Sequence, residues 1–127
     1  MENLVSTLRK HDLTVYRTGR IDISAHLASL LSLSPGDSIN VAKDGNEFYI
    51  YVAHRASSSN RQFRSRVFRS SSGGASFRLQ FKLLARRLMS ECNFHGSVMR
   101  IPAGSPLSKP FSPVAVPLIT YKIQNHD

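Results

Sequence analysis

The chain has 127 residues, enough for one compact hydrophobic core and too few for two ordinary domains. Hydrophobic residues make up 41% of it and charged residues 20%, which is typical of a globular protein rather than a disordered one. The single cysteine, Cys92, excludes an intramolecular disulfide and fits a reducing compartment. Neither a transmembrane stretch nor the apolar core of a secretory signal is present, so we expect a soluble, cytoplasmic protein.

Positive charge is concentrated in the middle of the chain. Residues 1–54 hold five basic and six acidic groups, whereas residues 55–100 hold ten basic groups and only Glu91. Nearly all of the formal net charge of +9 therefore belongs to residues 55–100. This distribution predicts a polyanionic partner for that region.

The first half of the sequence predicts two strands, a short helix and a hairpin, in that order. The two strands flank a turn at Thr18-Gly19, and Ser24 is a suitable N-cap for the helix that follows. Leucines at helical spacing occupy residues 27–31. The Lys-Asp-Gly-Asn segment at 43–46 separates two alternating runs and predicts a tight hairpin turn.

This order resembles the AbrB/MazE/SpoVT swapped-hairpin family of bacterial transcription factors and antitoxins. The family pattern runs from Gly-Arg-apolar-x-Ile-Pro through a short leucine-containing helix to Gly-Asp and a hairpin. The matching residues are Gly19, Arg20, Ile21, Ile23, Leu27, Leu31, Gly36, Asp37, Ile39 and Val41. Ser24 stands where the family has proline, and Ala28-Ser29 stand where it commonly has arginines. The resemblance is clearest over 13–52 and implies a DNA-binding barrel built from two interleaved copies of the motif.

Residues 64–122 repeat the same order of elements as a possible diverged second copy. The corresponding segments are 66–69 with 14–17, 77–81 with 20–23, 84–88 with 27–31, 95–101 with 35–41, and 114–122 with 47–52. Chance similarity between short amphipathic elements is the alternative explanation.

We therefore predict a mostly-β α+β fold: a swapped-hairpin (AbrB-like) barrel made from two internal β-β-α-β-β repeats. One domain would span 1–127, with repeat one at about 12–53, a serine- and arginine-rich linker at about 54–62, and repeat two at about 63–123. A duplicated chain would be complete as a monomeric pseudo-dimer. A homodimer, in which the copies pair between chains, is the other arrangement.

Basic side chains are the main candidates for function, because several guanidinium groups on one surface bind closely spaced phosphates. The candidate nucleic-acid-binding residues are Arg20, Arg64, Arg66, Arg69, Arg78, Lys82, Arg86 and Arg87. Helical spacing places Lys82 and Arg86 on one face, with leucines on the other. By the resemblance, Arg86-Arg87 restore the paired arginines that the first copy lacks, and arginines near the strand turns line a DNA-facing surface.

These features predict a protein that binds nucleic acid, most simply duplex DNA in transcriptional regulation. The alternative is a non-catalytic protein-interaction module, antitoxin-like or part of a larger assembly, whose basic face meets an acidic protein partner. A solvated basic surface without a specific partner is a third interpretation. Phenylalanines among the basic residues allow base stacking, but most occupy apolar positions that predict core packing.

Signals for catalysis or metal binding are weak. The acidic residues are scattered, no glycine-rich phosphate loop occurs, and the histidines lack zinc-ligand spacing. Cys92 fits a small, partly buried residue at a helix end better than a nucleophile. We expect a protein that is not an enzyme and uses neither cofactor nor metal.

Overall fold

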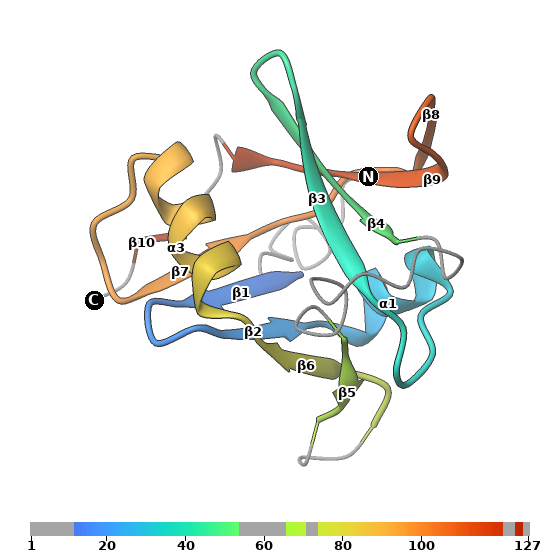
Figure 1. Ribbon diagram of the computed structural model, residues 1–127, viewed down its shortest axis with the longest axis horizontal. Helices are drawn as coiled ribbons and strands as arrows, with labels where there is room; N and C mark the ends of the chain where they lie inside the picture. Colours follow the sequence, from blue (N-terminus) through green and yellow to red (C-terminus); the bar gives the residue numbers. More distant parts are fainter. Residues whose placement is uncertain (1–11, 54–65, 71–73, 121–123, 126–127) are drawn as a thin grey trace, which may run out of the picture.

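The chain folds into two antiparallel sheets and two helices, seen in a computed structural model that describes residues 12–53, 66–70, 74–120 and 124–125 (Figure 1). The elements are β1 (Leu13–Tyr16), β2 (Arg20–Ile23), α1 (Ala25–Leu31), β3 (Ile39–Asp44), β4 (Glu47–Val52), β5 (Phe68–Arg69), β6 (Phe77–Gln80), α3 (Lys82–Glu91), β7 (Val98–Ile101), β8 (Leu107–Lys109), β9 (Ser112–Leu118) and β10 (Gln124–Asn125). No described helix is both long enough and apolar enough to cross a membrane.

Local sequence signals explain the elements of the first half. The β1–β2 turn contains Gly19, whose φ of +111° is one that residues with a Cβ rarely adopt. At the start of α1 the Leu27 amide donates to Ser24 Oγ at 3.1 Å, which confirms the predicted N-cap. Gly45, with φ of +65°, lies in the turn that joins β3 to β4, which confirms the predicted hairpin.

Each half of the chain contributes strands to both sheets. The larger sheet has the order β10-β7-β1-β2-β6-β5, and the smaller has the order β3-β4-β9-β8. In the larger sheet the inner strands β2 and β6 pair, placing Ile21 opposite Leu79. In the smaller sheet β4 pairs with β9, placing Ile50 opposite Val116. The two halves are therefore joined through inner strands of each sheet.

Two further contacts cross between the halves, one inside the larger sheet and one near its β5 edge. β1 pairs with β7 from Leu13 opposite Ile101 to Tyr16 opposite Val98. Near β5, the Val67 amide donates to the Asp37 carbonyl at 2.8 Å, beside an isolated bridge between Ser38 and Arg66. Thus β1, which opens the first half, contacts β7, which follows α3 in the second half. In the same way the segment just before β5 contacts residues 37–38, which follow α1 in the first half.

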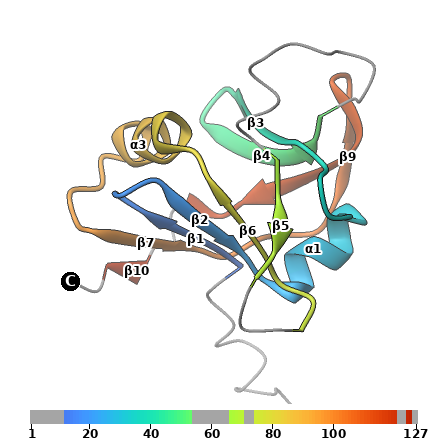
Figure 2. The same cartoon turned by 60° about the horizontal axis from the view of Figure 1, so that its bottom comes forward.

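The hydrophobic core lies between the two sheets, and the helices lie at opposite ends of it (Figure 2). Leu13, Val15, Ile21 and Ile23 point into the core from β1 and β2, as their alternation predicts. The other inward-facing residues with at most 2% exposure include Ile39, Ile50, Phe77, Leu79, Met99, Ile101 and Val116. The opposite face of the larger sheet carries Thr14, Asp22, Arg78 and Arg100 together with the exposed Phe68.

A buried carboxylate ties three segments together at the start of β1. Asp12 is 1% exposed and accepts hydrogen bonds from Ser24 Oγ at 3.1 Å and from the Ala103 amide at 2.9 Å. Its own carbonyl accepts from the Ser24 amide at 2.9 Å. Because a buried carboxylate is costly without partners, these bonds fix where the chain enters the larger sheet.

The mostly-β α+β class predicted from the sequence is confirmed, but the described strands do not form a closed barrel. The hydrogen-bonded ladders make two separate sheets. Between the strands of the two sheets the described connections are isolated bridges, Ser38 with Arg66 and Ala103 with Leu118. β5 has only two residues, Phe68–Arg69, so it does not extend this contact into a continuous ladder.

Candidate nucleic-acid interface

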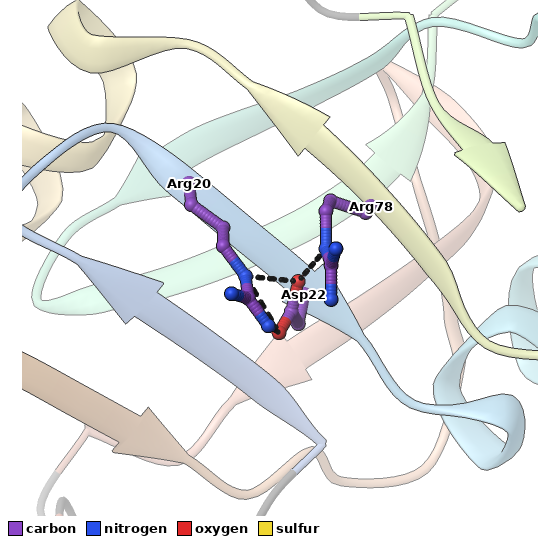
Figure 3. Close-up of polar contacts among 3 residues, drawn as sticks. All are labelled: Arg20, Asp22 and Arg78. Atoms are coloured by element: carbon purple, nitrogen blue, oxygen red, sulfur yellow. Dashed lines mark hydrogen bonds and ion pairs between the residues drawn. The ribbon is translucent and has the colours of Figure 1, made fainter. Parts of the chain in front are cut away.

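A carboxylate held by two arginines lies on the outer face of the larger sheet (Figure 3). Arg20 and Asp22 are two positions apart on β2, and Arg78 lies opposite Asp22 on β6, so all three point the same way. Arg20 Nη2 donates to Asp22 Oδ2 at 2.8 Å, and Arg78 Nε donates to Asp22 Oδ1 at 2.8 Å. The structure therefore brings together two of the predicted binding residues around an acid.

The electrostatics of this cluster favour its ionised form. Burial alone would raise the pKa of Asp22, but the hydrogen bonds and charges of Arg20 and Arg78 outweigh it and hold that pKa below its ordinary value. The hydrogen bond to Asp22 in turn raises the pKa of Arg20. Two cations and one anion leave a net positive cluster. Each guanidinium carries five N–H donors, and Asp22 accepts hydrogen bonds from only some of them.

Helix α3 presents a second group of predicted residues. Ala85, Leu88 and Met89 are buried, which leaves the opposite side of the helix in solvent. The exposed basic side chains on α3 are Lys82, Arg86 and Arg87. Leu88 is buried and Leu84 packs partly buried against the core, as the sequence predicted for these two leucines, whereas Leu83 is 71% exposed.

The exposed cations of α3 are not all equally available. Arg87 Nε donates to Glu91 Oε2 at 3.3 Å, one helical turn along, and Lys43 of β3 binds Glu91 Oε1 at 2.9 Å. Hydrogen bonds from Lys43 and then Arg87 lower the pKa of Glu91. Arg86 makes a longer contact, 3.4 Å from its Nε to the Arg17 carbonyl. Glu91 thus offsets Arg87 more directly than Arg86.

The β1–β2 turn packs against the beginning of α3. A Cβ on Gly19 would lie 2.9 Å from Lys82 Cα, and Gln80 Nε2 donates to the Thr18 carbonyl at 3.1 Å. Together with the bond from Arg86 to the Arg17 carbonyl, these contacts place α3 beside the turn from which Arg20 emerges. We call Arg20, Lys82, Arg86 and Arg87 the turn–helix surface.

The remaining predicted residues lie elsewhere or outside the described chain. Arg66 is exposed and bridges to Ser38, and Arg69 donates from Nη1 to the Gly74 carbonyl at 3.1 Å while lying over the Phe77 ring. β5 pairs with the start of β6, whereas α3 follows its end. Arg66 and Arg69 therefore form a separate group, at the other end of β6 from the helix. Arg64 lies outside the described residues.

Sequence reasoning missed one arginine of consequence. Arg100 of β7 lies opposite Thr14, which in turn lies opposite Asp22, so Arg100 shares the outer face of the sheet with the cluster. Its place between buried Met99 and Ile101 was a signal for this. Arg17, which the resemblance placed with Arg20 among the arginines near the strand turns, instead donates from its guanidinium to the Phe94 and Gly96 carbonyls at 3.0 Å each.

Four of the six described phenylalanines pack in or against the core, whereas Phe68 and Phe111 are exposed. Phe48, Phe77 and Phe94 are buried, whereas Phe68 is 58% exposed on β5. Phe63 lies outside the described residues. The buried three are unavailable to a nucleobase, so among the described phenylalanines of the basic region only Phe68 and the half-buried Phe81 can stack on a base.

No metal-binding arrangement is found in the described part of the chain. Its histidine, cysteine and acidic residues do not gather in groups of three or more. Cys92 is partly buried beside an open hollow that Lys43 and Glu91 also line. Burial raises the pKa of its thiol, which opposes the thiolate form that a nucleophile needs.

Comparisons with known proteins give no independent guide to the role of these residues. No protein-family model matches the chain, and no curated protein or solved structure is similar to it.

Proposed function

We propose that the protein binds nucleic acid, as duplex DNA in transcriptional regulation, through the turn–helix surface. The observation that carries this proposal is the packing of α3 against the β1–β2 turn, which sets Lys82 and Arg86 beside the base of Arg20. Duplex DNA presents one negative charge per about 1.7 Å along its axis, so neighbouring cations on a rigid helix and turn can neutralise successive phosphates. Release of counterions then supplies the affinity.

The proposed architecture is a swapped-hairpin arrangement made by an internal duplication. Equivalent strands of the two halves pair with each other, β2 with β6 and β4 with β9. The opening strand of each half contacts the other half, β1 through a ladder with β7 and the segment before β5 through the bridge from Arg66 to Ser38. Such an exchange is expected when one chain does the work of two interleaved subunits. Residues 12–53 and 63–123 would be the two repeats of one domain.

This architecture predicts a monomer. Both sheets draw strands from both halves of one chain, so no second copy is needed to complete the core. Light scattering of the purified chain tests this expectation. An obligate dimer would mean instead that the halves pair between chains.

A protein-interaction module is the second candidate, favoured by one observation. Leu83 is 71% exposed on α3 between the exposed Lys82 and the basic pair that follows. An apolar side chain surrounded by cations suits an acidic protein partner with an apolar anchor better than a phosphate backbone. Replacing Leu83 with serine would weaken such a complex and leave DNA binding unchanged.

Fluorescence anisotropy with a labelled random duplex, measured over a series of salt concentrations, tests the DNA proposal. The double variant Lys82→Ala/Arg86→Ala should bind more weakly, and its salt slope should fall by about one for each phosphate that it no longer neutralises. Lys109→Ala is a matched control, since Lys109 lies on β8 of the other sheet and pairs with Asp44. Binding no stronger than that of an unrelated protein of equal charge would reject DNA as the ligand. Equal weakening in the double variant and the control would exclude the turn–helix surface.

A further inference from the structure

The outer face of the larger sheet carries a continuous row of side chains that the turn–helix surface does not explain. Register places Phe68 opposite Arg78, Arg78 opposite Asp22, Asp22 opposite Thr14, and Thr14 opposite Arg100. Residues that are directly opposite in an antiparallel sheet project from the same face. Neighbouring strands lie about 4.8 Å apart, so four strand spacings make this row about 19 Å long.

Phe68 forms one end of the row and is the unusual residue in it. Its 58% exposure contrasts with 6%, 2% and 8% for Phe48, Phe77 and Phe94. Val67, its neighbour along the chain, is fully buried, so alternation holds Phe68 on the outer face. An exposed aromatic ring on a strand is a platform on which a base can stack, worth about 1–3 kcal/mol per base.

The remainder of the row supplies charge in fixed positions. The described outer face carries one acid, Asp22, and three arginines, Arg20, Arg78 and Arg100. Its net charge is therefore positive. The hydrogen bonds to Asp22 hold Arg20 and Arg78 in place (Figure 3). Arg20 also lies over the Tyr16 ring, with its Cζ 4.7 Å from the ring centroid. Two aromatic residues, Phe68 on β5 and Tyr16 on β1, therefore lie on either side of the two held guanidinium groups.

We propose that this outer face, defined by Tyr16, Arg20, Phe68, Arg78 and Arg100, binds single-stranded nucleic acid, with a base stacked on Phe68 and the backbone following the arginines. A duplex covers the faces of its bases by stacking them on each other, so Phe68 can reach a base only where the strands are separated. The row is long enough for a segment of about four nucleotides, the lower end of site sizes on comparable β surfaces. This role goes beyond the proposed duplex binding and uses a different surface, with Arg20 at their boundary.

The experiment measures binding of fluorescein-labelled dT12, rU12 and a mixed-sequence duplex to the full chain at low salt. Phe68→Leu should weaken binding of a single strand about fivefold or more, because leucine keeps an apolar side chain but cannot stack. Phe111→Leu is the matched control, since Phe111 is also exposed, at 39%, but lies at the β8–β9 turn of the other sheet. Arg100→Gln should weaken single-strand binding and reduce its salt slope.

The outcomes separate this proposal from duplex binding. The double variant Lys82→Ala/Arg86→Ala should lower duplex affinity. The factor by which Phe68→Leu weakens binding of dT12 should be the same in the double variant as in the wild type. Single-strand affinity that is unchanged in Phe68→Leu, or equal to that of the Phe111→Leu control, overturns the sheet-face proposal even if duplex binding persists. Loss of duplex binding alone overturns the DNA proposal and leaves the sheet-face proposal standing. Comparison of dT12 with rU12 identifies whether DNA or RNA is preferred. Circular dichroism establishes that each variant is folded.

Discussion

Asp22 on β2 and Arg78 on β6 lie directly opposite each other, and the Arg78 Nε donates to the Asp22 carboxylate at 2.8 Å. This ion pair crosses between the two halves of the chain on inner strands of the larger sheet. Arg20 binds the same carboxylate from within β2, at 2.8 Å. A single acid thus orients two of the cations that the sequence offered for phosphate contact.

Removal of this acid should weaken the fold. In Asp22→Asn the carboxylate no longer offsets Arg20 and Arg78, which then repel each other. The side chains are 26–40% exposed, so after allowance for solvent screening we expect the free energy of unfolding at pH 7 to fall by about 1 kcal/mol. Urea denaturation measures it. Asp44→Asn is the control, because Asp44 is 57% exposed in its pair with Lys109 and should change stability less.

The same cluster predicts a dependence on pH. Because the folded pKa of Asp22 lies below its unfolded value of about 3.9, the cluster contributes its full stability above that value. The contribution is lost as the pH falls through the folded pKa. The difference in unfolding free energy between wild type and Asp22→Asn should be constant from pH 7 to about 5 and shrink below about 4. A difference that grows on acidification would contradict this assignment.

Gly19 should be the least replaceable of the turn glycines. Its φ is +111°, and an added Cβ would meet Gln80 Nε2 at 2.7 Å and Lys82 Cα at 2.9 Å. We expect Gly19→Ala to lower the free energy of unfolding by about 2 kcal/mol or more. Gly45 also has a positive φ, but nothing lies within 4 Å of its added Cβ, so Gly45→Ala should cost about 1 kcal/mol. Equal losses would show that the approach of α3 to the turn is not restrictive.

Arg17 should affect stability rather than binding. Its two hydrogen bonds to the Phe94 and Gly96 carbonyls hold the segment between α3 and β7. Arg17→Ala should lower the free energy of unfolding by about 1–2 kcal/mol, with unchanged DNA affinity for the folded fraction. Arg87→Ala should do the reverse: its side chain is 74% exposed, so stability should stay within about 0.5 kcal/mol while DNA affinity falls. Thermal unfolding and anisotropy on the same preparations compare the two variants.

The two leucines of α3 should differ sharply when truncated. Leu88 is 3% exposed in the core, so Leu88→Ala should cost about 2–5 kcal/mol. Leu83 is 71% exposed, and Leu83→Ala should stay within about 0.5 kcal/mol. Urea titrations give both values. A large loss in Leu83→Ala would mean that this side chain packs against something in the folded chain.

Local patterns predicted the elements well because their causes are local. Ser24 caps α1, Gly45 lies in the β3–β4 turn, and alternation around Ile21 and Ile23 gives β2 its buried face. These local signals could not predict whether the two sheets close into a barrel, because closure depends on pairings between residues that are distant in the sequence. β5 has only two residues, and Ser38 and Arg66 form an isolated bridge. The described residues therefore make no hydrogen-bonded ladder between the larger sheet and β3.

The sequence predicted which basic residues are candidates for the site, but not how they are arranged on the surface of the fold. The basic run predicted phosphate contacts without showing how its members group, and in the fold β6 separates Arg66 and Arg69 from α3. Asp22 looked like an ordinary polar residue between two isoleucines, and only the pairing of β2 with β6 sets Arg78 across from it. The exposure of Phe68 likewise follows from its position on an edge strand, which the sequence around it does not reveal.

The pairing of β1 with β7 makes assembly of the larger sheet depend on synthesis of the chain through Ile101. β1 is made early, but its partner at Val98–Ile101 leaves the ribosome late, and β2 likewise waits for β6. At about 5–20 residues per second, several seconds pass in which these strands have unpaired edges. A chain that stops before Ile101 would keep such edges open and would be prone to aggregate. The nascent protein therefore completes the larger sheet only after β7 has left the ribosome.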